Sequence, residues 1–166
     1  MKKEFTLSIF TEDVVGILNR VSVIFARRNI NIDSITASLS EFKGIHRYII
    51  VINVEVELVK KLIKQLEKQV DVLKAFYHLN DEAIFQEIGL YKLPKNILVV
   101  GSEVEKVISK HNAKALTTES NFIIIEKIGQ SKELSALYDD LKPFGLLEFV
   151  KSGRLVISKS IMNLNL

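Results

Sequence analysis

The residues best suited to chemistry form one loop, DVVGIL (13–18), at the predicted start of a helix. The first four N–H groups of a helix have no partner inside it, and they carry the positive end of the helix dipole. A carboxylate can accept hydrogen bonds from such groups, and a glycine leaves room for its approach. The candidate donors are the N–H groups of Val15, Gly16, Ile17 and Leu18, with apolar walls from Val14, Val15 and Ile17.

Two polar residues, Asn31 and Asp13, could take part in an anion site or in an ordinary helix start. Asn31 begins the next predicted strand, where its amide could meet an ammonium or a carboxylate group. Asp13, in contrast, could be an ordinary N-cap, and Gly16 could serve only a tight turn from strand to helix. From these residues alone, an anion site and a plain turn both remain open.

The rest of the sequence offers little for catalysis. There are no cysteines, which excludes disulfides, thiolate metal ligands and cysteine nucleophiles. The three histidines, His46, His78 and His111, lie far apart, and none has a carboxylate at metal-ligand spacing. No phosphate-binding glycine loop, nucleophile elbow or HExxH motif occurs. We therefore expect no catalytic residues and no metal site, a pattern that favours a ligand-sensing or subunit-binding protein over an enzyme.

Composition restricts the class of protein further. The chain has 166 residues, of which 48% are hydrophobic and 26% charged, as in folded globular proteins. Its net charge of +3 is dispersed, whereas a nucleic-acid site would collect basic residues on one face. The longest apolar runs are too short to span a bilayer, and the N-terminus lacks a signal-peptide pattern. We expect a cytoplasmic protein with no nucleic-acid or membrane partner.

The first half of the chain alternates between strand and helix patterns. Strands are predicted at 5–10, 32–40, 46–54 and 70–79. The apolar faces of two intervening helices are Ile17, Leu18, Val21, Ile24 and Phe25, and then Val56, Val59, Leu62, Ile63, Leu66 and Val70. The order strand, helix, strand, strand, helix, strand is the ferredoxin-like βαββαβ unit.

The second half fits the same order. Strands are predicted at 87–93, 113–118, 121–129 and 146–153, and RLVISKS extends or follows the last one. One helix is predicted at 102–112, where Ser102 and Glu105 form a capping box, and another at 131–145, capped by Ser131. The run ILVV (97–100) fits either an extended continuation or the end of a helix.

We therefore predict an α+β protein built from two tandem ferredoxin-like βαββαβ domains. The first domain covers 1–79, a short linker covers 80–83, and the second domain covers 84–166. Val23 lies on the helix face opposite the apolar stripe, and 32–40 should be an edge strand, which folded proteins normally cover. Together these features favour a homodimer formed through the first domain.

The stretch EDVVGILNRVSVIFARRNINIDSITAS resembles the N-terminal ACT domain of the small, regulatory subunit of acetolactate synthase (acetohydroxyacid synthase). The similarity continues through VDVLKAFYHL, QEIGLYKL and LKPFGLLEFVKSGRLVISKS, and it covers nearly the whole chain. The specific signal is the combination of Gly-Ile-Leu-Asn-Arg-Val, Asn-Ile-Asn-Ile-Asp-Ser-Ile-Thr, Val-Asp-Val-Leu and Ser-Gly-Arg.

The resemblance implies an ACT domain for effector binding and dimerisation, followed by a C-terminal ferredoxin-like domain. It implies a partner, the acetolactate synthase large catalytic subunit, which uses thiamine diphosphate, Mg²⁺ and FAD to join two pyruvates, or pyruvate and 2-oxobutyrate. That reaction begins branched-chain amino-acid synthesis. In such complexes the small subunit activates catalysis and carries feedback inhibition, typically by valine, and no cofactor is expected on the small subunit itself.

The resemblance also implies an effector site by position. The site would use the loop Asp13 to Leu18, together with Asn31 and Ile32 of the neighbouring ACT domain. Thr36 and Ser38 would lie nearby on the strand. The family often has Asn in place of Asp13 and a small residue or proline in place of Val15. A carboxylate at position 13 would repel the effector's carboxylate or, in another orientation, pair with its ammonium.

Two other functions fit parts of the sequence. The first is a free-standing tandem-ACT regulator that senses an amino acid and acts on a different partner. The second is an RNA-binding module, because RNA-recognition domains share the ferredoxin-like order and stack bases on strand aromatics. Phe5, Phe10 and Tyr48 fall on the relevant strands, but no basic-Gly-aromatic run accompanies them.

Overall fold

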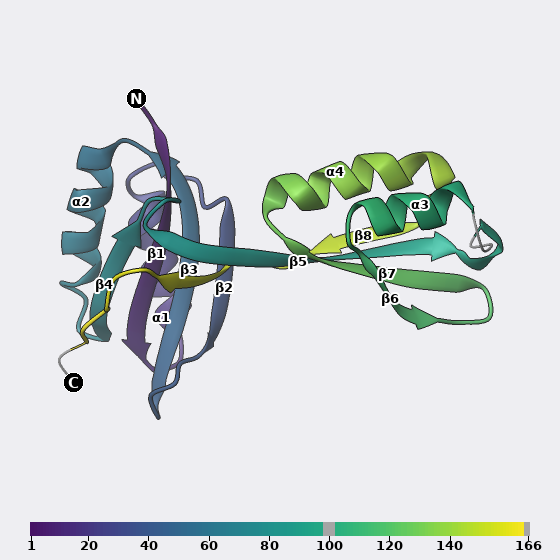
Figure 1. The fold of residues 1–166 in the computed structure, drawn as a ribbon. Helices are drawn as coiled ribbons and strands as arrows, with labels where there is room; N and C mark the ends of the chain where they lie inside the picture. The colour runs from purple at the N-terminus through teal and green to yellow at the C-terminus, as the bar shows by residue number, and fades with distance from the viewer. Residues whose placement is uncertain (98–101, 165–166) are drawn as a thin grey trace. The chain divides into compact units, whose positions relative to one another are not determined.

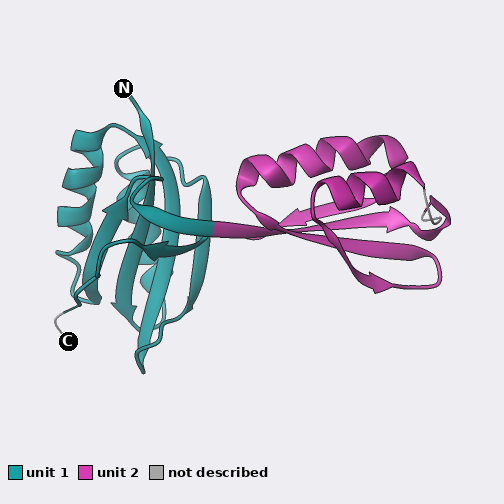
Figure 2. Ribbon diagram, in the orientation of Figure 1, with its two compact units in different colours: residues 1–85, 154–166 teal, residues 86–153 magenta. Residues whose placement is uncertain are grey.

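The computed structural model describes residues 1–97 and 102–164. Its contacts divide the chain into two compact units, shown in different colours in Figure 2. Unit 1 is Met1–Phe85 together with Arg154–Leu166, and unit 2 is Gln86–Gly153. The sequence predicted a continuous second domain over 84–166, whereas in the structure the end of the chain, from Arg154, groups with unit 1.

Unit 1 has the predicted ferredoxin-like order (Figure 1). Its elements are β1 Lys3–Glu12, α1 Ile17–Ala26, β2 Ser34–Leu39, β3 Ile45–Val54, α2 Val56–Leu66 and β4 Val72–His78. The strands form an antiparallel sheet in the order β2-β3-β1-β4, so β2 is an edge strand, as predicted. The prediction was wrong for Val70, which lies beyond the end of α2 and is exposed.

One face of this sheet packs against both helices. Alternate residues of β1 (Phe5, Leu7 and Ile9) meet the apolar stripe of α1, which includes Ile17 and Val21. This core is the one that the 3.6-residue and two-residue periodicities predict.

The second face of the unit 1 sheet is also buried. Thr6, Ser8 and Phe10, the intervening residues of β1, are all covered. The cover is formed by the start of β5 (Ala83–Pro94) and by β9 (Leu155–Ser158), whose Val156 packs with Ile49 and Ala83. Both faces of β1 are therefore buried, although its sequence FTLSIF alternates apolar and polar residues, a pattern more typical of a strand with one solvated face.

Unit 2 repeats the architecture. Its elements are β5, the 3₁₀ turn η1 Lys95–Ile97, α3 Glu103–Lys110, β6 Lys114–Thr118, β7 Phe122–Gly129, α4 Ser131–Leu141, the 3₁₀ turn η2 Lys142–Phe144 and β8 Glu148–Lys151. The strand order is β6-β7-β5-β8, with Tyr91, Leu93, Ile123 and Ile125 facing the helices in the core. The predicted hairpin is present as β6 and β7, and within ILVV only residue 97 is among the described residues.

The opposite face of the unit 2 sheet is exposed. Ile88, Ile128 and Val150 keep 36%, 49% and 54% of their surface accessible. A shallow hollow of about 210 Å³ lies on this face, lined by Leu90, Lys92, Phe122, Ile124, Glu148 and Val150. The two units therefore share a fold but differ in whether the second sheet face is covered.

The helix ends of unit 2 test the predicted caps. Ser102 caps α3, as predicted, by accepting a hydrogen bond from the N–H of Glu105 at 3.3 Å. The prediction of Ser131 as the cap of α4 was wrong, because Gln130 is the N-cap and forms a capping box with Glu133. Across 1–97 and 102–164, no helix is long and apolar enough to cross a membrane.

Candidate functional site

The loop between β1 and α1 makes a tight left-handed turn. The N–H of Asp13 donates to the carbonyl of Gly44 at 3.0 Å, and the N–H of Val14 donates to the carbonyl of Glu12 at 3.1 Å. Gly16 then takes φ 81° and ψ 1° as the N-cap of α1. Only glycine adopts this region without strain, which explains its presence, since a Cβ there would meet no atom within 4 Å.

Asp13 is not the N-cap of α1, so that reading of the sequence was wrong. Its carboxylate Oδ1 instead lies 3.1 Å from Nε2 of His46 on the neighbouring strand β3. The register of β1 on β3 explains the contact, because Glu12 is paired with Ile45. His46 also stacks on Tyr48, and burial raises the pKa of Tyr48, which lies beside Thr11 and Asp13.

The N-terminus of α1 is the least protected among the helices of the described residues. It has neither a side-chain cap nor an acidic residue in its first turn. The other helix of unit 1, α2, has Glu57 in its first turn, and both α3 and α4 have side-chain caps and acidic residues. The positive end of the α1 dipole is therefore left available to an anion from outside the chain.

The apolar residues around this helix end differ in exposure. Ile17 is buried in the core and Val14 packs partly against it. Val15 is fully exposed, and 43% of Leu18 is accessible. The loop therefore presents backbone N–H groups beside apolar side chains, the combination that an amino acid with a small apolar side chain requires.

Asn31 and Ile32 lie at the other end of α1. Asn31 is exposed and borders a hollow with Lys2, Asn53 and Glu55. The residue that starts β1, Lys3, is paired with Val54, whereas the loop follows Glu12 at the opposite end of the strand. Within one copy, then, Asn31 and the loop are at opposite ends of the sheet, and a site that uses both needs a second copy.

Thr36 and Ser38 lie on β2, the edge strand. They are paired with Ile49 and Arg47 of β3, so both are on the face away from the helices. The Thr36 hydroxyl is buried and has no hydrogen-bond partner among the described residues, and Ser38 is exposed. Neither residue is brought to the loop within one copy.

An exposed apolar surface runs over α1 and β2. Leu18, Val23, Ile35 and Leu39 are between 36% and 65% accessible. The sequence predicts Val23 on the helix face opposite the apolar stripe and Ile35 on the edge strand. An exposed edge strand beside exposed apolar residues is the kind of surface that proteins cover by pairing.

Sequence reasoning missed two neighbours of the loop. The carbonyl of Gly44 accepts a hydrogen bond from the N–H of Asp13, and the imidazole of His46 contacts the Asp13 carboxylate. Both come from the β2–β3 turn and the start of β3, more than thirty residues away, and only the β1–β3 pairing brings them near. In the described parts of the chain, no group of three or more potential metal ligands is close enough to hold a metal ion.

Comparisons with known proteins identify relatives for both units. Residues 7–74 match the family model of the acetolactate synthase (AHAS) small subunit-like ACT domain. Residues 86–160 match the family model described as the small subunit of acetolactate synthase.

Full-length relatives carry the same description. An acetolactate synthase small subunit of Mycolicibacterium smegmatis is 33% identical over 93% of this chain and 90% of its own length. One of Bacillus subtilis is also 33% identical, over 92% of this chain and 88% of its own length. The crystal structure of an acetolactate synthase small subunit from Thermotoga maritima shares the fold, with a TM-score of 0.83, 23% identity and coverage of 96% and 99% of the two chains.

Proposed function

This chain belongs to the family of acetolactate synthase small subunits, and on that premise we propose that it activates a catalytic large subunit and carries feedback inhibition by valine. The large subunit would hold thiamine diphosphate, Mg²⁺ and FAD, and the small subunit would bind the effector. A cytoplasmic location follows from this role.

The observation that carries the effector proposal is the unprotected start of α1. Gly16 turns the chain at the start of the helix, where the N–H of Ile17 donates to the carbonyl of Val14 at 3.4 Å, and no acidic side chain of the first turn competes for the remaining N–H groups. The effector's carboxylate would accept hydrogen bonds from these groups, because they offer unsatisfied donors and the positive end of the helix dipole.

The rest of valine would be recognised by the loop side chains. Its isopropyl group would contact Val14 and Leu18, which are partly accessible. Its ammonium would lie toward Asp13, whose carboxylate is largely exposed and points to His46. In this orientation Asp13 attracts the ammonium rather than repelling the carboxylate, so Asp in place of the family's common Asn is compatible with binding.

The site would be completed by a second copy. Asn31 and Ile32 are at the far end of α1 in one chain, so a pair of chains joined along α1 and β2 would bring them to the partner's loop. The accessible apolar residues Val23, Ile35 and Leu39 lie on that surface and would be covered in the pair. Because the site lies between copies, valine binding would favour one packing of the dimer over another.

Inhibition would then be a coupling free energy between valine and the catalytic subunit, typically about 1–3 kcal/mol. Such coupling is reciprocal. If valine weakens the binding of this chain to the active large subunit by some factor, the active large subunit must weaken the binding of valine by the same factor. Calorimetric titrations of valine into the chain alone and into the complex would measure this factor.

The direct test of the loop is Gly16→Asp, with Gly145→Asp as the matched control. Both glycines have φ close to 80°, so both substitutions strain the backbone similarly, but Gly145 is in unit 2. We expect Gly16→Asp to weaken valine binding by about tenfold or more, because its carboxylate would occupy the open helix end. Gly145→Asp should leave affinity unchanged. Equal affinity of the two variants would remove the loop from the mechanism.

The role in catalysis is tested by co-expression with the large subunit of the same genome. We expect this chain to raise acetolactate formation and to make it sensitive to valine, with leucine and isoleucine as comparison effectors. If the chain binds valine but recovers no thiamine-diphosphate-dependent partner, it acts instead as a sensor for another protein.

A further inference from the structure

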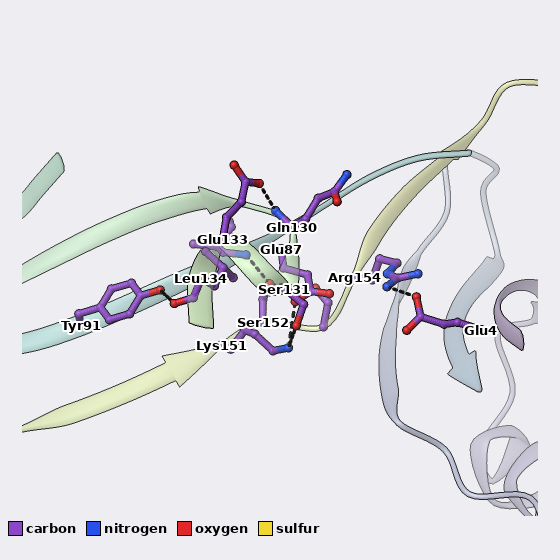
Figure 3. Close-up of polar contacts among 12 residues, drawn as sticks. Glu4, Glu87, Tyr91, Gln130, Ser131, Glu133, Leu134, Lys151, Ser152 and Arg154 are labelled. Atoms are coloured by element: carbon purple, nitrogen blue, oxygen red, sulfur yellow. Dashed lines mark hydrogen bonds and ion pairs between the residues drawn. The ribbon is translucent and has the colours of Figure 1, made fainter. Parts of the chain in front are cut away.

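The buried residue Arg154 connects the end of the chain to the beginning of unit 1. Only 4% of its surface is accessible. Its guanidinium donates to the hydroxyl of Thr6 at 2.7 Å, to Asn80 Oδ1 at 3.2 Å and to Glu4 Oε1 at 2.8 Å. It also lies over the ring of Phe85, with its central carbon 3.9 Å from the ring centroid. All four partners belong to unit 1, and Figure 3 shows the pair with Glu4.

The chain crosses the boundary between the units twice, and the secondary structure differs at the two crossings. The first passage, at Phe85–Gln86, lies inside the continuous strand β5 (Figure 2). The second, at Gly153–Arg154, lies between β8 and β9, and both of these strands pair with β5. Unit 2 is therefore inserted in the sequence between two segments of unit 1, the first ending at Phe85 and the second beginning at Arg154.

The second passage is fastened on both sides. On the unit 2 side, Ser152 exchanges two hydrogen bonds with the backbone of Ile88, at 2.8 and 2.9 Å. Next to it, Lys151 pairs with the buried Glu87 at 3.0 Å and donates to the hydroxyl of Ser131 at 2.7 Å (Figure 3). On the unit 1 side, Arg154 donates to Thr6, Asn80 and Glu4, so only Gly153 separates the contacts within unit 2 from those within unit 1.

The segment that follows Arg154 adds further contacts to unit 1. We call Arg154–Ser160 the strap. The Val156 side chain is buried against Ile49 and Ala83, and its carbonyl accepts a hydrogen bond from Arg47 at 3.0 Å. The N–H of Lys159 donates to the carbonyl of Glu82 at 3.0 Å. The strap is thus part of unit 1 by its packing and its hydrogen bonds, although it follows unit 2 in the sequence.

We propose that unit 2 is an insertion in unit 1 and that Arg154 is a positioning residue, which fastens the returning chain to β1 and thereby couples unit 2 to the effector-binding unit. Glu4 and Thr6 are on β1, and β1 leads directly into the loop at Asp13–Gly16. A change in β1 on effector binding would reach β8 through Arg154 and the single glycine that precedes it. The regulatory part of this proposal rests on the proposed function, whereas the structural part does not.

The structural part is tested on the full-length chain by hydrogen exchange of Arg154→Met, with Lys151→Met as the matched control. Methionine keeps an unbranched apolar stem over Phe85 but removes the hydrogen bonds. We expect Arg154→Met to speed exchange by about tenfold or more in β1 and β9, while β7 and α4 keep their protection. Lys151→Met should loosen unit 2 at β5 and α4 and leave β1 protected.

The reverse pattern, or exchange that rises equally in both units, would overturn the assignment of the strap to unit 1. Arg154→Lys adds a graded comparison, because lysine keeps the charge but cannot reproduce the forked geometry of the guanidinium. We expect its exchange in β1 to fall between those of the wild type and Arg154→Met. Exchange as fast as in the methionine variant would mean that charge alone contributes nothing.

The regulatory part is tested in the reconstituted enzyme. We expect Arg154→Met to reduce the maximal inhibition by valine severalfold, while calorimetry shows valine affinity for the chain within about threefold of the wild type. If affinity and inhibition change by the same factor, Arg154 supports only the stability of the binding unit and the coupling role is refuted. If the wild-type chain binds no valine, the proposed function fails, and hydrogen exchange still decides the structural part.

Discussion

The two units have the same strand order and opposite exposures. In unit 1 the second face of the sheet is covered by β9 and the start of β5, and the N-terminus of α1 is open. In unit 2 the second sheet face is exposed, and the N-termini of α3 and α4 are both capped. The same fold therefore exposes different surfaces in the two units: a helix N-terminus in unit 1 and a sheet face in unit 2.

This contrast determines which surfaces of each unit are available for binding. A capped helix has its first N–H groups satisfied internally, so it offers little to an anion, whereas the open end of α1 offers donors and a dipole. A covered sheet face offers stability rather than recognition, whereas an exposed apolar face is available to other surfaces.

The largest effect is expected from a charge placed on each second face. Val156→Asp puts a carboxylate into the covered face of unit 1, where the side chain is 4% accessible, and we expect a loss of about 3 kcal/mol in unfolding free energy. Val150→Asp, on the exposed face of unit 2, should cost about 1 kcal/mol or less, mainly through strand propensity. Urea unfolding of both full-length variants makes the comparison, and equal losses would contradict the difference in covering.

The next effect is a loss of stability of unit 2 at alkaline pH. Burial raises the pKa of Tyr91 from 10.0 to about 12, and its hydroxyl donates to the carbonyl of Leu134 at 2.8 Å. The unfolded chain therefore loses this proton first as pH rises. The stabilisation is complete below about pH 10 and falls by about 2–3 kcal/mol as pH rises through 12.

Tyr91→Phe isolates this contribution, because the variant has no phenol to ionise. Burial also raises the pKa of Tyr48 in unit 1, so the wild type loses stability in both units under alkaline conditions. Urea unfolding from pH 8 to 11.5, followed by NMR signals of β7, should show a flatter dependence in the variant. A variant with the wild-type slope would exclude Tyr91 as the source.

A smaller effect is expected from removing a cap. Ser102→Ala deletes the hydroxyl that accepts from the N–H of Glu105, and we expect unit 2 to lose about 1 kcal/mol of unfolding free energy. Thermal unfolding, with signals assigned to α3, measures the loss. Ser22→Ala, in the middle of α1, is the control, since its hydroxyl caps no helix end and should cost far less.

The smallest stability effect comes from partly closing the open helix end. Asn19→Asp places an acidic residue in the first turn of α1, and we expect it to stabilise unit 1 by about 0.3–1 kcal/mol. The same carboxylate should weaken valine binding severalfold, because it competes for the same helix end. In this one variant, thermal unfolding should therefore show higher stability and calorimetry should show lower affinity for valine. A gain in both stability and affinity would refute the anion site.

Much of the fold could be predicted from periodicity. Helices α1 to α4, the β6–β7 hairpin, the edge position of β2 and the cap at Ser102 all follow from local patterns in the sequence. The errors also have local causes. Ser131 is the better N-cap by residue type, but Gln130 takes the position, and its N–H donates to the carboxylate of Glu133. Val70 keeps the spacing of the α2 stripe, although α2 ends at Leu66.

Less of the candidate site could be predicted. Gly16 stands out in the sequence as a glycine at a predicted helix start, and the structure shows that it has a positive φ, a conformation that favours glycine. The contact of Asp13 with His46 depends on the pairing of β1 with β3, which joins residues that are far apart in the chain. In the sequence, Arg154 is distinguished only as part of a family motif, since nothing near it indicates that Glu4 and Thr6 are its partners.

Patterns of residues close together in the sequence are sufficient to predict the helices and strands, and motifs spread along nearly the whole chain are sufficient to assign the family. The tertiary structure is needed to show which sheet face is covered, that Asn31 is at the far end of α1 from the loop, and that the strap belongs to unit 1. The physical reason is that burial and hydrogen bonding act between residues that are neighbours in space. A segment such as the strap has the same local preferences whichever unit it joins, and its partners alone decide where it packs.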